Sequence, residues 1–329
     1  MDKKQWLMPA ALLFCAAAAS LSLVLGAVRL SPVQLWQALA GGPKNTAGYI
    51  FWYARLPRTA ACLLSGAALA VSGAVIQAVL SNKLASPGII GVNAGAGLAV
   101  TLCCALGLLS GWVIALSAFG GAMVSVLLVM FTAEKTGASR TTVILGGVAV
   151  NSFLGALSEA LTTLVPDAGV LSGDFRVGGF SSVVPVRLMP AGILICCALV
   201  ILLTLRNDLD VLALGEETAQ SLGMPVKKTR TLFLVLSAML AGASVSFAGL
   251  LGFVGLIVPH ALRSLVGSES SKLLPLCAIG GAGFVTACDL AARLLFVPYE
   301  LPVGILMSVL GGPFFLWLLI KRKGGRTYA

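Results

Sequence analysis

Few side chains in this sequence are of a type and spacing that could do chemistry. The chain has one histidine, His260, and it has no GxSxG, no HExxH, no GxxxxGK[ST] phosphate loop and no pair of carboxylates at helical spacing within an apolar stretch. A histidine that follows a proline beside a helix start is more often structural than a ligand. The sequence therefore predicts no catalytic residue, no metal site and no cofactor, and the chain cannot hydrolyse a nucleotide alone.

Two carboxylates lie inside apolar stretches, where they could take part in a proton relay. Asp289 precedes Arg293 by four residues, and this spacing on a helix favours a mutual ion pair. Glu159 falls late in its stretch, so it is expected near the outer end of a helix rather than at the bilayer centre. Neither position favours an internal proton relay, which indicates that any energy source lies outside the chain.

The elements that must hold these residues are apolar helices. Of the 329 residues, 58% are hydrophobic and only 10% are charged, whereas a soluble domain has about 25% charged residues. Apolar stretches run unbroken for about 20 residues, which excludes a soluble globule and an outer-membrane barrel. We expect an all-α, polytopic membrane protein in which residues 1–329 form one transmembrane domain of about ten helices. The expected spans are 6–28, 59–80, 88–109, 112–132, 141–165, 189–205, 231–248, 255–266, 273–296 and 301–320.

The net charge of +10 would suggest nucleic acid in a soluble protein. Here the cations fall mainly in short loops between apolar stretches, so they are better explained by membrane orientation and do not indicate a nucleic-acid partner. With a cytoplasmic N-terminus, 15 of the 22 Lys and Arg residues fall on the inner side and seven on the outer side. This asymmetry predicts a multi-pass protein of the plasma (inner) membrane, surrounded by lipid, with both termini in the cytoplasm.

The longest polar segment, residues 206–230, is expected on the inner side. Glu216 and Glu217 are typical of a helix start, and Gly223 and Pro225 are typical of a stop. Leu212, Leu214 and Leu222 cannot all be buried in so short a loop. Because a helix of about seven residues is unstable alone in water, this one must dock onto the chain's own helices or onto a partner, and we favour a partner.

Four stretches resemble the permease subunits of the cobalamin and iron-siderophore (type II) ABC importer family. They are LDVLALGEETAQSLGM (209–224), the long stretch from RLPRTAACLL to GVNAGA (55–96), FVGLIVPHALR (253–263) and ELPVGILMSVLGGPFFLWLL (300–319). One departure is Lys83, which stands where the family usually has proline in a turn. The resemblance implies a dimer of permease subunits, identical or paralogous, around a central path. Its partners would be a cytoplasmic ABC ATPase dimer and an extracytoplasmic substrate-binding protein.

The resemblance also implies roles for particular residues. The short helix that enters a cleft of the ATPase would be formed by Leu214, Gly215, Glu216, Ala219, Leu222 and Gly223. Arg55, Arg58 and Arg293 would meet acidic residues of the binding protein, with snorkelling toward lipid headgroups as the alternative. Asn82, Leu84, Thr141 and Thr142 would form a cytoplasmic gate, although polar residues at helix ends are as often caps.

These observations favour a permease subunit of an ATP-driven, binding-protein-dependent importer for a metal chelate. A ferric siderophore is the first expectation for the substrate, with haem and cobalamin behind it, since the path itself reveals no specific ligand. A secondary carrier that works without ATP and a membrane scaffold remain the alternative classes.

Overall fold

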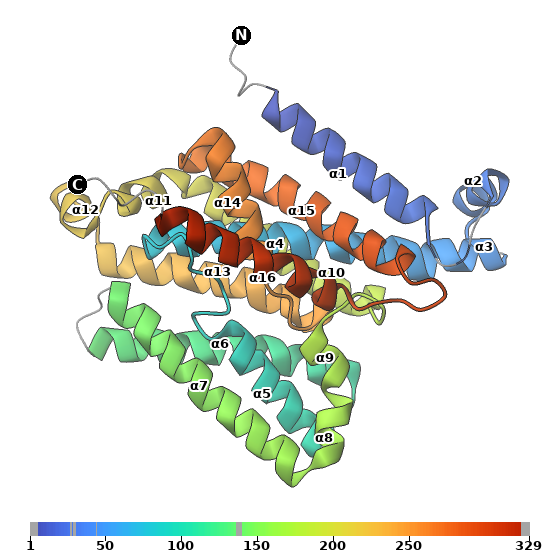
Figure 1. Cartoon of the computed structure of the whole chain (residues 1–329), viewed down its shortest axis with the longest axis horizontal. Helices are drawn as coiled ribbons and strands as arrows, with labels where there is room; N and C mark the ends of the chain where they lie inside the picture. Colours follow the sequence, from blue (N-terminus) through green and yellow to red (C-terminus); the bar gives the residue numbers. More distant parts are fainter. Residues whose placement is uncertain (1–5, 27, 29–30, 44, 136–139, 324–329) are drawn as a thin grey trace.

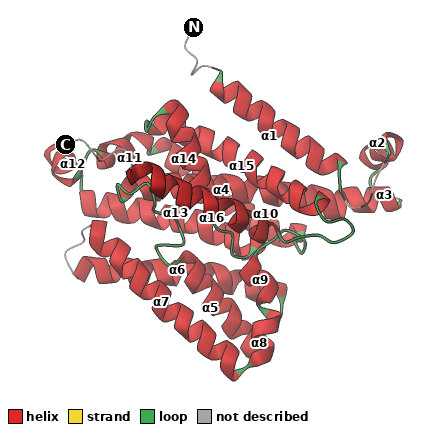
Figure 2. Ribbon diagram, viewed as in Figure 1, coloured by secondary structure: helices red, strands yellow, loops and turns green. Residues whose placement is uncertain are grey.

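A computed structural model shows that the chain folds into helices joined by short connections (Figure 2). It describes residues 6–26, 28, 31–43, 45–135 and 140–323, except for the side chains of residues 32, 319 and 321–323. No strand occurs in these ranges. The expectation of an all-α membrane protein is confirmed.

Ten helices follow the order of the expected spans. They are α1 (Leu7–Val24), α4 (Leu56–Val79), α5 (Val92–Ala105), α6 (Gly111–Lys135), α7 (Arg140–Leu164), α10 (Pro185–Thr204), α13 (Val226–Ala248), α14 (Val254–Val266), α15 (Ser270–Leu294) and α16 (Val303–Lys323). Seven candidate spans in the described chain are long and apolar enough to cross a membrane, and α5, α14 and the described part of α16 are shorter apolar helices. The shortening of α5 and α14 has a local cause, because Gly91 and Phe253 precede them with φ of 99° and 64° and so break any helix there.

Seven short elements connect the long helices of the described chain. They are α2 (Pro32–Gly41), α3 (Thr46–Tyr49), η1 (Ile50–Arg55), α8 (Pro166–Leu171), α9 (Gly173–Val177), α11 (Arg206–Ala213) and α12 (Glu216–Ser221). Figure 1 shows α8 and α9 beside α5 at the lower edge of the view. In the same view, α2 and α3 lie at the right, whereas α11 and α12 lie at the left. The long helices run between these two ends, so residues from distant parts of the chain meet at each of them.

The centre of the molecule is an antiparallel pair of long helices, α4 and α13. The Oγ atoms of Ser65 and Ser244 are 2.6 Å apart, and Ser72 Oγ donates to the carbonyl oxygen of Ser237 at 2.8 Å. Each bond joins one helix to the other, and each pairs a polar group that water cannot reach. The buried side chains of α4 and α13 therefore form the core against which the other helices pack.

Glycines let α4 approach two further helices at backbone distance. A Cβ atom at Gly66 would lie 2.1 Å from the carbonyl oxygen of Gly281 on α15, and one at Gly73 would lie 2.0 Å from that of Gly255 on α14. No side chain fits at such distances, so α4, α14 and α15 are packed through their backbones, as small residues permit in membranes.

Five of the described cations lie in two groups that match the two sides expected for them. Arg55, Arg58 and Arg293 line one cavity at the end with α2 and α3, whereas Lys83 and Arg263 line a cavity beside α11. Five counted cations, Lys3, Lys4, Arg29, Lys44 and Arg326, lie outside the described residues. The cytoplasmic location of both termini stays a prediction.

Candidate functional site

The polar segment 206–230, which we call the coupling segment, is anchored by α11. This helix has Leu209 and Leu212 buried against the core, and it packs on α4 and α15. Asp210 accepts hydrogen bonds from the backbone N of Ser270 at 3.0 Å and from its Oγ at 2.6 Å. These bonds satisfy donors at the start of α15, so α11 is fixed to the transmembrane helices at both its apolar and its polar face.

The helix α12 is a separate, exposed element. Gly215, with φ of 125°, separates it from α11, and Gly223, with φ of 81°, follows it. Ala219 is fully buried, whereas Leu214 and Leu222 are 66% and 64% exposed. The prediction that the leucines of this segment cannot all be buried is correct. Two exposed leucines beside a short ordered helix form an apolar surface of the kind that a partner protein covers.

Two arginines join the coupling segment to the long helices. Arg230 Nη2 lies 2.8 Å from Glu216 Oε2, and Arg140 Nη2 donates to the carbonyl oxygen of Leu212 at 3.0 Å. The sequence analysis did not assign either arginine a role. The available signal was their position, since each stands at the start of a long helix and close to the polar segment.

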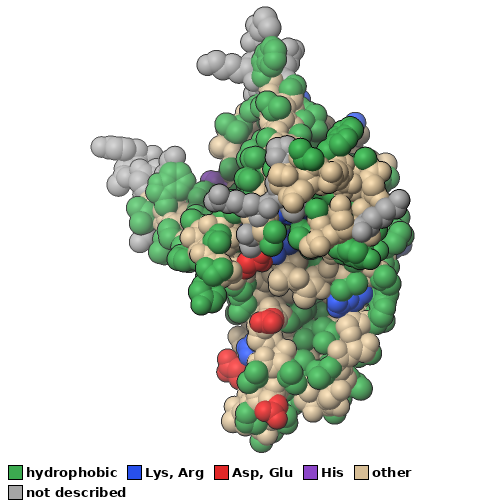
Figure 3. All heavy atoms as spheres, turned by 90° about the vertical axis from the view of Figure 1, so that its right-hand side faces the viewer, with side chains coloured by type: hydrophobic (Ala, Val, Ile, Leu, Met, Phe, Trp, Pro, Cys, Tyr) green, Lys and Arg blue, Asp and Glu red, His purple; other side chains and the backbone are tan. Residues whose placement is uncertain are grey.

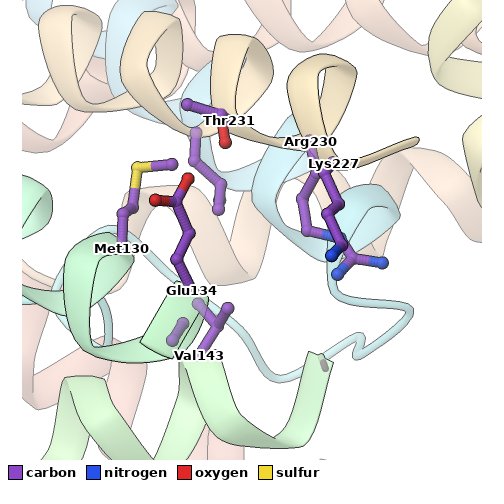
Figure 4. A pocket seen from close by; sticks show the side chains of 8 residues that line it. Met130, Glu134, Val143, Lys227, Arg230 and Thr231 are labelled. Atoms are coloured by element: carbon purple, nitrogen blue, oxygen red, sulfur yellow. The ribbon is translucent and has the colours of Figure 1, made fainter. Parts of the chain in front are cut away.

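A small cavity separates α13 from the hairpin of α6 and α7 beside these arginines (Figure 4). Glu134 extends from α6 toward α13. In this view Lys227 and Arg230 extend downward from α13, to the right of Glu134. The cavity measures about 20 Å³, which is room for about one water molecule. It is too small for a transported solute, but it shows that packing is incomplete where α7 meets α13.

The loop between α4 and α5, residues 80–91, contains the first two predicted gate residues. Asn82 Oδ1 accepts a hydrogen bond from the backbone N of Leu84 at 3.0 Å, and the Asn82 carbonyl oxygen accepts one from Ala85 N at 3.0 Å. An asparagine side chain that accepts a hydrogen bond from the backbone N–H two residues later stabilises a turn. The turn is therefore ordered with Lys83 in place of the family's proline, and Asn82 is the residue that holds it.

The other two predicted gate residues, Thr141 and Thr142, lie in the first turn of α7. The loop 80–91 contacts this same helix about one and a half to three turns further along, at Gly147 and Asn151. A Cβ atom at Gly147 would lie 2.2 Å from the Ile89 carbonyl oxygen, and Asn151 Nδ2 donates to the Gly88 and Ile89 carbonyl oxygens at 2.8 and 3.1 Å. Both segments that were expected to form the gate are thus attached to α7.

At the opposite end, Arg55 stabilises the end of α1. Its guanidinium donates to the carbonyl oxygens of Leu23 at 2.8 Å and Val24 at 2.5 Å, and it also bonds to the Val28 carbonyl oxygen. The last carbonyl groups of a helix have no partner within it, so an arginine that bonds to them caps the helix. Arg55 is only 5% exposed as a result.

Asp289 is the centre of an ion network. It lies 3.0 Å from Arg58 Nη2 and 3.1 Å from Arg293 Nε, which confirms the expected pair with Arg293. Arg58 Nη1 also lies 2.6 Å from Glu300 Oε2, and Arg293 Nη2 donates to Ser22 Oγ at 2.6 Å. The network joins α1, α4, α15 and the loop before α16.

The placement of the predicted docking arginines differs from the exposed cluster that we expected. Arg55 and Arg293 are 5% and 3% exposed, because α1 carbonyls and Asp289 satisfy them inside the chain. Arg58 lies closer to the surface, where it shares Glu300, and the three arginines line a cavity of about 230 Å³. Figure 3 looks onto this end and shows mostly apolar and neutral side chains, with small areas of Lys and Arg and of Asp and Glu. Their role in docking stays a prediction.

The single histidine lies apart from these groups. The rings of His260 and Phe314 pack edge to face with centroids 5.8 Å apart, and both line a cavity with Lys83. This packing gives His260 a structural place on α14.

Comparisons with known proteins agree on one class of protein. Residues 12–321 match the FecCD transport family. The vitamin B12 import system permease proteins of Salmonella typhimurium and Salmonella typhi are 40% and 39% identical over 315 residues, which is 91% of this chain and 93% of theirs. Among solved structures, a metal-chelate type ABC transporter in an inward-facing conformation is similar with a TM-score of 0.83 at 28% identity, over 95% of this chain and 98% of that one. PsaBC from Streptococcus pneumoniae, solved with a Fab, shares the fold with a TM-score of 0.56 at 17% identity, over 86% and 94%.

Proposed function

The chain belongs to the FecCD transport family, and from that premise we propose that it carries a corrinoid of the vitamin B12 type into the cell. It is a permease subunit of a type II ABC importer, and permease subunits of such importers are transport components that work with an ATPase and a second permease subunit. We propose the substrate, and we propose roles for the residues described above in coupling, docking and gating.

The substrate is proposed from the curated relatives. Proteins that are 40% identical over 91% of this chain import vitamin B12, so cobalamin moves ahead of the ferric siderophore that the sequence analysis placed first. The likeness to a metal-chelate type transporter keeps a ferric siderophore, and haem, as the second candidates. All are bulky chelates, and we propose that a separate binding protein selects among them.

The observation that carries the coupling proposal is the exposure of Leu214 and Leu222 beside a fixed helix. Ala219 holds α12 against the chain, and the two glycines, Gly215 and Gly223, set its ends, so the leucines are presented in one orientation. An ATPase dimer would cover them, and its closure would push α12 as a rigid unit. Glu216 would keep α12 attached to α13 through its ion pair with Arg230.

We propose that the binding protein docks at the outer end through Arg58. An acidic side chain of the binding protein would replace Glu300 on this guanidinium, while Arg55 and Arg293 hold α1 and α15 in place beneath it. The gate would be formed by Asn82 and Leu84 on the loop 80–91, together with Thr141 and Thr142 on α7. A dimer of permease subunits, identical or paralogous, would surround the path in the inner membrane.

The experiment is uptake by the complex in proteoliposomes. The chain, its ATPase and its binding protein are reconstituted, and ATP-dependent uptake of labelled cobalamin is compared with that of ferric siderophores and haem. Uptake of cobalamin that needs ATP and the binding protein supports the proposal. Accumulation that a proton uncoupler abolishes and that does not respond to the ATPase would identify a secondary carrier instead.

Variants of the coupling segment test the same proposal at the level of residues. Leu214→Asp with Leu222→Asp should abolish copurification of the ATPase, because charge replaces the apolar contact. Leu232→Asn, which changes an exposed leucine on α13, is the matched control and should leave ATPase binding unchanged. If the double variant still binds the ATPase and transports normally, the coupling assignment is wrong.

A further inference from the structure

One arginine joins the coupling segment directly to the helix that carries the predicted gate. Arg140 is the first residue of α7, and its Nη2 donates to the carbonyl oxygen of Leu212 at 3.0 Å. Leu212 lies in the last turn of α11, where carbonyl groups have no partner within the helix. The bond is therefore a specific contact between two helix ends that are 72 residues apart in the sequence.

Glu216 places the start of α12 within reach of the same arginine. Its carboxylate pairs with Arg230 at 2.8 Å, and Arg140 interacts electrostatically with both Glu216 and Arg230. One carboxylate thus attracts guanidinium groups from α7 and α13, and the two guanidinium groups repel each other. A displacement of Glu216 would change the electrostatic force on Arg140, because the carboxylate attracts this guanidinium while Arg230 repels it.

The build of α7 suits it to move as a unit. It is a continuous helix of 25 residues with no proline, and few of its residues are buried: Val143, Gly147, Leu154 and Ser158. Its start borders the small cavity beside α13, which Val143 helps to line. A continuous helix with so few buried residues loses few internal contacts when it shifts.

One predicted gate segment lies on this helix, and the other is bonded to it. Thr141 and Thr142 directly follow Arg140, and the loop 80–91 with Asn82 and Leu84 is bound to α7 through Gly147 and Asn151. A shift of α7 would therefore act on all four gate residues at once.

We propose that Arg140 is a positioning residue that transmits a displacement of the coupling segment, at the end of α11 next to α12, to α7, and through α7 to both halves of the gate. The proposal rests on the proposed function, since it needs an ATPase that moves α12. In the absence of Arg140, α12 would still bind the ATPase through its leucines, but the coupling segment would lose this bond to α7 and keep its contacts with α4, α13 and α15.

The test measures coupling rather than activity alone. In the reconstituted complex, the substrate transported per ATP hydrolysed is compared for the unmodified chain, Arg140→Ala and Arg140→Lys. Arg140→Ala should keep ATPase binding and ATP hydrolysis but lower this ratio by about tenfold, as expected for the loss of a charge-assisted hydrogen bond. Arg140→Lys should recover part of the ratio, because lysine keeps the charge and one donor. Lys228→Ala removes an exposed cation at the start of α13 and serves as the matched control.

A second measurement follows the gate itself. Thr141→Cys, at an exposed position, is labelled with a membrane-impermeant maleimide in the presence and absence of ATP. Labelling should depend on nucleotide in the parent chain and become independent of nucleotide when Arg140→Ala is added. A role of Arg140 in folding alone would change the yield of complex but would leave this nucleotide dependence in the molecules that assemble.

Several outcomes would overturn the inference. Equal coupling ratios for Arg140→Ala and Lys228→Ala would do so, and so would nucleotide-dependent labelling that persists without the arginine. Where Arg140→Ala assembles poorly, Arg140→Lys and Arg140→Gln are compared, and equal ratios for these two would reject it. Failure of the unmodified complex to bind an ATPase or to transport would contradict the proposed function instead, so the two failures are distinguishable.

Discussion

Replacing Asp289 by alanine should destabilise the protein more than other single changes at its outer end. The carboxylate is buried between Arg58 and Arg293 at 3.0 and 3.1 Å, so its removal leaves two guanidinium groups without their shared acid. Arg58 would keep Glu300, whereas Arg293 would keep only its bond to Ser22 Oγ among the contacts described. Removing one partner of a buried ion pair costs about 3–5 kcal/mol, because an uncompensated charge stays inside the protein.

The assay is equilibrium unfolding of the purified chain in mixed micelles with increasing denaturing detergent. Glu300→Gln is the matched control, because it removes the more exposed acid of the same network, and a surface pair contributes about 0–1 kcal/mol. Asp289→Asn should fall between the two, since the amide oxygen still accepts a hydrogen bond. If Asp289→Ala unfolds within about 1 kcal/mol of the unmodified chain, the network is not a stabilising element and this reasoning fails.

Three further changes test other contacts. Gly66→Val should prevent stable folding, because its Cβ would lie 2.1 Å from a backbone oxygen of α15. Gly120→Val is the control and should express and unfold normally, because a Cβ atom at Gly120 meets no atom within 4 Å. Equal yields of the two variants would contradict the close packing. Arg58→Gln should weaken binding-protein association measured by surface plasmon resonance, and Glu300→Gln should strengthen it because it frees the guanidinium; unchanged affinities in both would reject docking at this site. Asp210→Ala should raise the rate of backbone amide hydrogen exchange at the start of α15, because it removes the cap on Ser270 N. The loss of a helix cap destabilises a helix by about 1 kcal/mol. Unaltered exchange would show that the cap is dispensable.

Much of the architecture could be predicted from the sequence because it depends on local patterns. Unbroken apolar stretches predict the ten apolar helices, and the acids, glycines and leucines of segment 206–230 predict a short helix with exposed leucines. The pair of Asp289 with Arg293 follows from a spacing of four residues on one helix. Each of these features joins neighbours in the chain.

The contacts that could not be predicted join residues far apart. Arg58 and Asp289 are 231 positions apart, and Arg140 and Leu212 are 72 apart. No periodicity in the sequence reports such a pairing, since it depends on which helix ends meet. For this reason three arginines that were expected at an exposed surface instead cap α1 and neutralise Asp289, and the two that bind the coupling segment were overlooked.

The glycines at the two ends of α12, Gly215 and Gly223, make the residues between them an exchangeable segment. Gly215 and Gly223 adopt backbone conformations that fix where the short helix enters and leaves, so the sequence between them can change while the membrane helices keep their geometry. If this segment is replaced by the one from another permease of the family, the chain should bind that permease's ATPase. Importers that recognise only their own engineered ATPase could be built in this way within one cell.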